Sequence, residues 1–149
     1  MDIKTPEERS KNMAAIHSRN TKPEIWFRKQ LFARGYRYRL NANKIQGHPD
    51  IYLRKYNTAI FIHGCFWHRH QGCKYAYMPK SRVEFWNKKF DANIKRDEKI
   101  KEELYNRGIK CLIIWECSIK KMRKENGFYL ENMKRVEAFL KNKDYSLEL

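Results

Sequence analysis

The sequence lacks long apolar runs and has little glycine, proline or cysteine. Of its 149 residues, six are glycine, four are proline and four are cysteine. No apolar run approaches the roughly 18 residues that a membrane span needs, so we expect no transmembrane segment. The polar start at residues 1–13 has no apolar stretch of the kind found in signal peptides. Without repeats or linkers, residues 1–149 are predicted to form one cytoplasmic domain, whose cysteines favour a metal site or free thiols over disulfides.

Acidic residues are scarce relative to basic ones. The chain has 33 Lys and Arg against 17 Asp and Glu, which gives a formal net charge of +16 and a pI near 9.8. A lysine-rich solvated surface is one interpretation, but so large an excess favours a polyanionic partner, with nucleic acid first. A membrane surface is a weaker candidate, because no basic amphipathic helix stands apart from the expected fold.

Apolar periodicity predicts alternating helices and strands. Thr21 and Glu24 form a capping box before an amphipathic stretch that ends at Gly35. The Ile-rich stretch 109–115 is typical of a strand buried on both faces. The order α-β-β-β-α-β-α predicts an α/β fold in which helices cover a mixed sheet. Helices are expected over 21–34, 82–107 and 128–141, and strands over 36–40, 109–115 and, as a hairpin, within 50–63.

The hairpin predicts where a carboxylate and an imidazole meet. With a two-residue turn at 56–57, Asp50 lies opposite His63 and on the same face of the sheet. A slip of one residue would place Asp50 opposite Ile62 or Gly64 instead. Asp50 follows "GHP", so it is either a turn residue or a ligand for Mg²⁺, with a backbone carbonyl of the facing strand as a further oxygen ligand.

The stretch "HGCFWHRHQGC" at 63–73 concentrates metal-binding side chains. It holds three of the five histidines and two of the four cysteines. Zinc takes four nitrogen or sulfur ligands in a tetrahedron. Unrelated buried thiols are the alternative, and Cys111 is expected to pack as a small apolar residue. Spacing alone does not choose among the three histidines of the stretch, but one set could surround a single ion: Cys65, His70, Cys73 and Cys117.

Other residues have both a structural and a functional interpretation. Glu24 can serve the capping box alone. Phe66 and Trp67 can pack under the metal loop, or they can stack on or wedge between bases. Met13 can dock an amphipathic first helix, or it can act with the two rings.

Taken in order, these segments resemble the very short patch repair endonucleases, the Vsr family of DNA mismatch nickases. The resemblance runs through "TPEERSKNM", "GHPD", "IFIHGCFWHRH", "RVEFWNKKFDANIKRD" and "IIWEC", over roughly residues 5 to 117. It implies a restriction-endonuclease-like fold with a structural zinc. It also implies an Mg²⁺-dependent endonuclease that nicks one strand at T:G mismatches, which arise when 5-methylcytosine deaminates.

The resemblance also assigns roles to residues. Asp50 would bind Mg²⁺ with the backbone carbonyl of Ile62, where the family often has threonine. His68 would be the general base, with His63 assisting at the phosphate and Glu24 supporting the site. Zinc would be held by Cys65, His70, Cys73 and Cys117. The DNA would be contacted by an arm at residues 1–20 and wedged by Met13, Phe66 and Trp67.

The implied partner is mismatched double-stranded DNA, bound by a nucleoid-associated monomer that can act with mismatch-repair proteins. Two departures from the family pattern are His48, where a basic residue is usual, and one extra residue before Cys73. Two other functions fit part of the pattern. A related nuclease could cut matched DNA, and a non-catalytic zinc module could bind DNA without needing Asp50 or His68.

Overall fold

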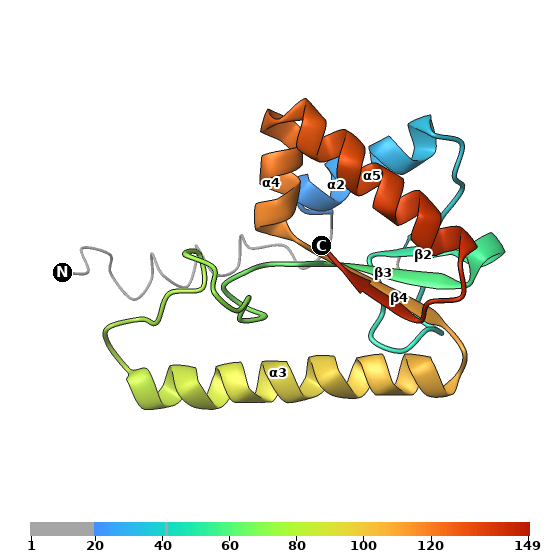
Figure 1. Ribbon diagram of the computed structural model, residues 1–149. Helices are drawn as coiled ribbons and strands as arrows, with labels where there is room; N and C mark the ends of the chain where they lie inside the picture. Colours follow the sequence, from blue (N-terminus) through green and yellow to red (C-terminus); the bar gives the residue numbers. More distant parts are fainter. Residues whose placement is uncertain (1–19, 41) are drawn as a thin grey trace.

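The computed structural model describes residues 20–40 and 42–149 and is built on a five-stranded mixed sheet (Figure 1). The strands lie in the order β1-β2-β3-β4-β5. β1, β2 and β3 are antiparallel neighbours, whereas β3, β4 and β5 run parallel. The strands are β1 (Arg39–Leu40), β2 (Ile51–Leu53), β3 (Thr58–His63), β4 (Lys110–Trp115) and β5 (Ser146–Glu148). The predicted arm at 1–20, with Met13, lies outside the described residues apart from Asn20.

Helices cover both faces of the sheet (Figure 1). One face carries α2 (Lys22–Ala33), α4 (Glu116–Lys124) and α5 (Asn126–Lys141), and the other carries α3 (Val83–Asn106). Each face has its own apolar core: Phe27, Leu31, Ile114 and Val136 belong to the first, and Phe61, Leu104, Cys111 and Ile113 to the second. The predicted α/β, restriction-endonuclease-like architecture is therefore confirmed. No helix in the described ranges is long and apolar enough to cross a membrane.

The helix predicted at 21–34 forms as its end signals indicate. The Thr21 side chain accepts a hydrogen bond from the Glu24 backbone N–H at 3.4 Å, which caps the first turn. Gly35 follows the last turn with φ of 93°, a conformation that costs glycine little. The long helix predicted at 82–107 is α3, and it also ends before a glycine with positive φ.

The predicted hairpin register is wrong by two residues. We expected a two-residue turn at 56–57, but the chain forms a 3₁₀ turn, η1 (Arg54–Tyr56), followed by Asn57 with φ of 47°. Leu53 consequently pairs with Thr58. Since side chains alternate with a period of two, this shift leaves each residue on its predicted face of the sheet.

Two elements were not predicted. α4 begins directly after β4, and its buried Ile119 and Met122 lie three residues apart on one helical face. β5 pairs in parallel with β4 at the far edge of the sheet. The strand predicted over 36–40 is limited to the two residues of β1, and the helix predicted from 128 begins at Asn126.

Candidate active site and metal-binding cluster

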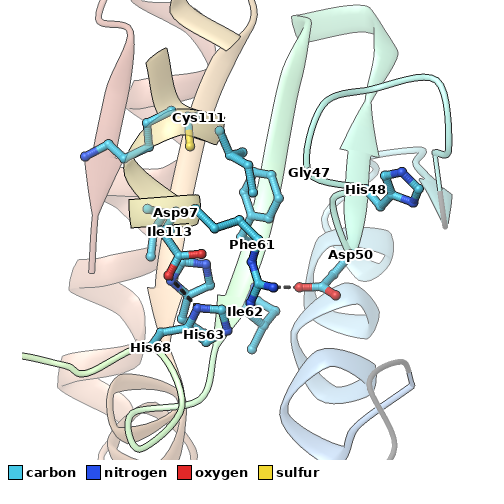
Figure 2. Close-up of a pocket in the computed structure, with 13 residues that line it drawn as sticks. Gly47, His48, Asp50, Phe61, Ile62, His63, His68, Asp97, Cys111 and Ile113 are labelled. Atoms are coloured by element: carbon cyan, nitrogen blue, oxygen red, sulfur yellow. Dashed lines mark hydrogen bonds and ion pairs between the residues drawn. The ribbon is translucent and has the colours of Figure 1, made fainter. Parts of the chain in front are cut away.

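Asp50 lies immediately before β2, where its carboxylate meets the neighbouring strand. Its Oδ2 accepts a hydrogen bond from the Ile62 backbone N–H at 2.7 Å (Figure 2). In a β-strand, the N–H and C=O of one residue face the same neighbour. The Ile62 carbonyl therefore faces the same side as Asp50. The register shift did not separate Asp50 from His63, because both remain on the face that α3 covers.

A cavity of about 410 Å³ opens beside Asp50. β3 and β4 form its floor, α3 forms one wall, and the loop containing Gly47 and His48 forms another (Figure 2). Gly47 has a positive φ of 78°, and a Cβ there would lie 2.6 Å from the Ile100 side chain, so this loop can approach α3 only with glycine. His48, the first departure from the family pattern, is exposed at the cavity wall.

Two histidines and an aspartate form a connected group in this cavity. The rings of His63 and His68 stack with their centroids 3.8 Å apart and their planes at 4°. His68 Nδ1 lies 2.7 Å from Oδ2 of Asp97 on α3. With Asp97 ionised, Nδ1 carries the proton and Nε2 keeps the lone pair. His68 is thus held in the tautomer that can accept a proton at Nε2.

The cavity disfavours charge on two of its groups. Burial raises the pKa of Asp50 to about 6. The hydrogen bond from the Ile62 N–H lowers this pKa, and the nearby carboxylate of Glu24 raises it. Burial also lowers the pKa of His63 to about 3, with a smaller contribution from His68. His63 is therefore neutral near pH 7, and burial makes the ionised form of Asp50 costly, although His68 partly offsets that cost.

Glu24 is placed to influence Asp50. Glu24 lies in the first turn of α2 and is only 2% exposed. Its Oε1 lies 3.6 Å from Arg28 NH1. A second buried carboxylate beside Asp50 is unfavourable unless positive charge lies near both. The pair accordingly favours a cation in the cavity.

A second group of ligand atoms lies in the loop after β3 and at the start of α4. The four atoms lie within 4.8 Å of one another, and Cys117 Sγ is 3.3 Å from His70 Nδ1. Three thiols and one imidazole at such spacing are the donor set of a tetrahedral zinc site. Cys111 lies outside this group and is buried in the α3-side core, as expected from its apolar strand. The members of this Cys/His cluster are Cys65, His70, Cys73 and Cys117.

Arg69 fastens the loop that carries the Cys/His cluster. Its guanidinium donates to the backbone carbonyls of Phe66, Ala76 and Tyr77 at 3.3, 2.8 and 3.1 Å. The same group lies 4.0 Å from the ring centroid of Phe90 on α3. Side-chain contacts therefore hold the loop to α3, while the Cys/His cluster connects the loop to α4 through Cys117.

Trp115, the last residue of β4, lies between the two groups. Its ring stacks on His70 at 4.2 Å and meets His63 edge-on at 5.2 Å. Its indole Nε1–H donates to Glu148 of β5 at 2.6 Å. One buried ring thus contacts both the Cys/His cluster and the histidine pair of the cavity.

Phe66 and Trp67 are partly exposed and belong to an aromatic cluster at the N-terminal end of α3. The Phe66 ring lies 5.0 to 5.7 Å from its aromatic neighbours, which include Trp86 and Phe90. The Trp67 carbonyl accepts a hydrogen bond from Asn93 at 2.9 Å. The aromatic cluster supports the Phe66 and Trp67 rings on one side and leaves part of each ring in contact with solvent.

Asp97 is the group that sequence reasoning missed. It lies in the sheet-facing stripe of α3, whose members Phe90, Asn93, Asp97, Ile100 and Leu104 are three or four residues apart. An aspartate at an apolar position of a helix is a recognisable signal, because a carboxylate there needs a partner. Ile94 is apolar but lies off this stripe and is 37% exposed.

Comparison with known proteins identifies the family to which the chain belongs. The family model described as DNA mismatch endonuclease Vsr matches residues 1–74. The type II nicking enzyme V.NmeAIP of Neisseria meningitidis is 48% identical, over 80% of this chain and 84% of its own length. V.XorIIP of Xanthomonas oryzae is 38% identical, over 79% and 86%, respectively. The DNA mismatch endonuclease Vsr of Escherichia coli is 37% identical, over 80% and 76%. The chain therefore belongs to the Vsr family of DNA mismatch endonucleases and is a strand-nicking endodeoxyribonuclease.

Proposed function

We propose that this enzyme uses Mg²⁺ to nick one strand of DNA at a T:G mismatch, the lesion left when 5-methylcytosine deaminates. The observation that carries the proposal is the convergence of a carboxylate, a backbone carbonyl and a carboxylate-held histidine on one open cavity. A module that only bound DNA would have no need of this set. The family description supports a mismatch as the substrate.

The donors around Asp50 fit Mg²⁺. A carboxylate and the Ile62 carbonyl are hard oxygen ligands, and a cation would compensate the charge that burial makes costly on Asp50. Because the second ligand is a backbone atom, isoleucine in place of threonine leaves it unchanged. When bound there, Mg²⁺ stabilises negative charge that develops on the phosphate oxygens. Glu24 lends its negative charge to the same site.

His68 acts as the general base. Asp97 holds its Nδ1–H, so Nε2 accepts a proton from the attacking water as the water oxygen bonds to phosphorus. The bond from phosphorus to the leaving sugar oxygen breaks, and that oxygen takes up a proton from solvent water. Neutral His63 stacks on His68, fixes the plane of its ring and assists at the phosphate.

The Cys/His cluster holds a structural zinc ion. Four protein donors complete a tetrahedron and leave no position for water or substrate, unlike a catalytic zinc site with three protein ligands. Zinc would bind the Cys65 thiol as thiolate, although burial raises the pKa of that thiol to about 12 in the metal-free protein. The zinc therefore serves the reaction indirectly, by fixing the loop between β3 and α3.

The rings of Phe66 and Trp67, with Met13 from the arm, wedge into the duplex at the mismatch. Inserting a ring between base pairs costs a few kcal/mol of stacking, which is roughly the scale on which a weak pair differs from a matched one. Partial exposure and aromatic support suit rings that must enter a stack without rearranging.

A nicking assay tests the proposal. Duplexes with T:G, T:A or C:G at one central position and randomised flanking bases are incubated with and without Mg²⁺, with each strand labelled in turn. We expect one strand of the T:G duplexes to be cut, only with Mg²⁺, and Asp50→Asn to serve as the inactive control. Equal cutting of matched duplexes would overturn the mismatch assignment, and cutting without divalent metal would overturn the mechanism.

A further inference from the structure

A basic groove lies at the β1 edge of the sheet, away from both metal-binding groups. Its volume is about 490 Å³. Four of its six lining residues are cationic, none is acidic, and two tyrosines complete it: Arg37, Tyr38, Arg39, Tyr52, Arg54 and Lys55.

The strand register puts Arg39 and Tyr52 of this groove on the catalytic face, whereas Tyr38 packs against the core of the other face. Arg39 of β1 pairs with Tyr52 of β2, so the two side chains share a face. Tyr52 is two residues from Asp50 and therefore points the same way. Tyr52 also packs against the core that α3 covers. The groove thus continues the surface on which Asp50 meets the cavity.

The spacing along β2 suits a DNA backbone. Arg39, beside Tyr52, lies about 7 Å from Asp50 along the strand, whereas Arg54 lies in the 3₁₀ turn that follows the end of β2. A DNA strand presents one phosphate for roughly each 3.4 Å of helix rise. Arg39 can therefore reach a phosphate roughly two nucleotides from a phosphate bound at Asp50, and Arg54 can contact the strand farther along.

These cations have no ion-pair partner among the residues that the structure describes. Within residues 20–40 and 42–149, no ion pair involves Arg39, Arg54 or Lys55, whereas Arg28 and Arg34 each pair with a glutamate. Another basic groove, between α2 and α4, includes Glu116 among its lining residues and lies on elements of the opposite face. Charge and position therefore both favour the groove at the β1 edge as the one that binds DNA phosphates.

We propose that this groove, defined by the six residues above, binds the sugar–phosphate backbone of the strand that is nicked, on one side of the scissile phosphate. The proposal rests on the proposed function, because it takes Asp50 to mark the scissile phosphate. Arg39 and Arg54 contact phosphates and carry no base specificity, so they fix the position of the strand relative to Asp50 rather than the sequence that is cut.

The test measures the salt dependence of DNA binding without Mg²⁺, for Arg39→Gln/Arg54→Gln and for a matched control, Lys134→Gln/Lys143→Gln. The control removes two exposed cations from the α5 region. For the groove variant, the plot of log binding constant against log salt concentration should become shallower by about 2, equally on T:G and T:A duplexes. The control variant should change this slope little. An unchanged slope, or a loss confined to T:G duplexes, would overturn the proposal.

A second measurement uses neutral methylphosphonates, placed one at a time within four nucleotides on either side of the nick on each strand. Replacing a phosphate that contacts the groove should weaken DNA binding by the wild type roughly tenfold. The same replacement should not weaken binding by the groove variant any further. Equal losses for both proteins at every position would contradict the proposal. Wild-type nicking of the same T:G duplex is scored separately, so failure of the proposed function is distinguishable from failure of the groove.

Discussion

The Cys/His cluster and the catalytic cavity both contact Trp115 but are built in opposite ways. The cluster brings four soft donors within 4.8 Å of one another, and they can satisfy one ion completely. The cavity keeps a carboxylate with a pKa of about 6 and a histidine with a pKa of about 3, because burial disfavours the charged form of both groups. The first arrangement suits stability and the second suits chemistry. Substitutions in the two regions should therefore be separable by their effects.

The largest effect on nicking is expected from Asp50→Asn. The change removes the anionic metal ligand, and metal stabilisation of the transition state is worth several kcal/mol, so the rate should fall at least about 10³-fold. Zinc content and affinity for DNA should stay close to those of the wild type. A single-turnover assay with elemental analysis of the same sample checks both. Wild-type nicking by this variant would place the metal elsewhere.

His68→Ala is expected to come next. Loss of the general base should lower the nicking rate by ~10²–10⁴-fold. Asp97→Asn keeps the shape of the side chain but weakens its hold on Nδ1–H, and should cost roughly 10–100-fold. If Asp97→Asn matched the wild type, the carboxylate would have no part in orienting the base.

Cys73→Ala tests the other side of the comparison. Zinc-binding energy is folding energy, but two apolar cores remain, so we expect the melting temperature to fall by roughly 10 °C rather than folding to fail. Cys111→Ala is the matched control, because its thiol lies outside the cluster and its loss should leave one zinc per chain. Full zinc content in Cys73→Ala would remove that residue from the ligand set.

A smaller effect concerns the stability of the metal-free protein. The pKa of Asp50 is raised from 3.8 to about 6, so its contribution to stability is full below pH 3.8 and is lost as the pH rises through 6. Asp50→Asn should therefore be more stable than the wild type at pH 7.5 by about 1–3 kcal/mol, and the difference should vanish near pH 4. Urea unfolding at several pH values measures this. Saturating Mg²⁺ should narrow the gap at pH 7.5.

The smallest effect on stability is expected from Trp67→Ala. The ring is partly exposed, so the free energy of unfolding should change by less than about 1 kcal/mol, against roughly 3–5 kcal/mol for a tryptophan packed in a core. The preference for T:G over matched duplexes should fall roughly tenfold if the ring wedges the mismatch open. A large loss of stability with the preference intact would make Trp67 a packing residue.

Much of the fold follows from local signals in the sequence. The capping box at Thr21 and the glycine after α3 mark helix ends that the structure reproduces. The hairpin register does not follow from local signals, because groups elsewhere in the chain stabilise the left-handed conformation of Asn57. Its side chain accepts from the Tyr52 hydroxyl at 2.6 Å and donates to the Gly108 carbonyl at 3.0 Å. Contacts across 51 residues leave no trace in a local pattern.

The candidate sites divide in the same way. The crowding of histidine and cysteine at 63–73 indicates a metal-binding loop from composition alone. Cys117 joins it because β3 and β4 pair in parallel, His63 beside Trp115, which brings the ends of the two strands together. Asp97 looked like one charge among many in α3, and only its place in the buried stripe distinguishes it. The role of Trp115 depends on three tertiary contacts.

The central claim is that two metals serve two separate purposes, and a metal add-back measurement tests it most directly. Wild-type protein is passed by gel filtration into metal-free buffer, its zinc is quantified, and nicking of a T:G duplex is followed before and after single metals are added. We predict one zinc per chain throughout, no nicking before addition, and full nicking with Mg²⁺ alone. Nicking before any addition, or recovery that requires zinc, would contradict the account.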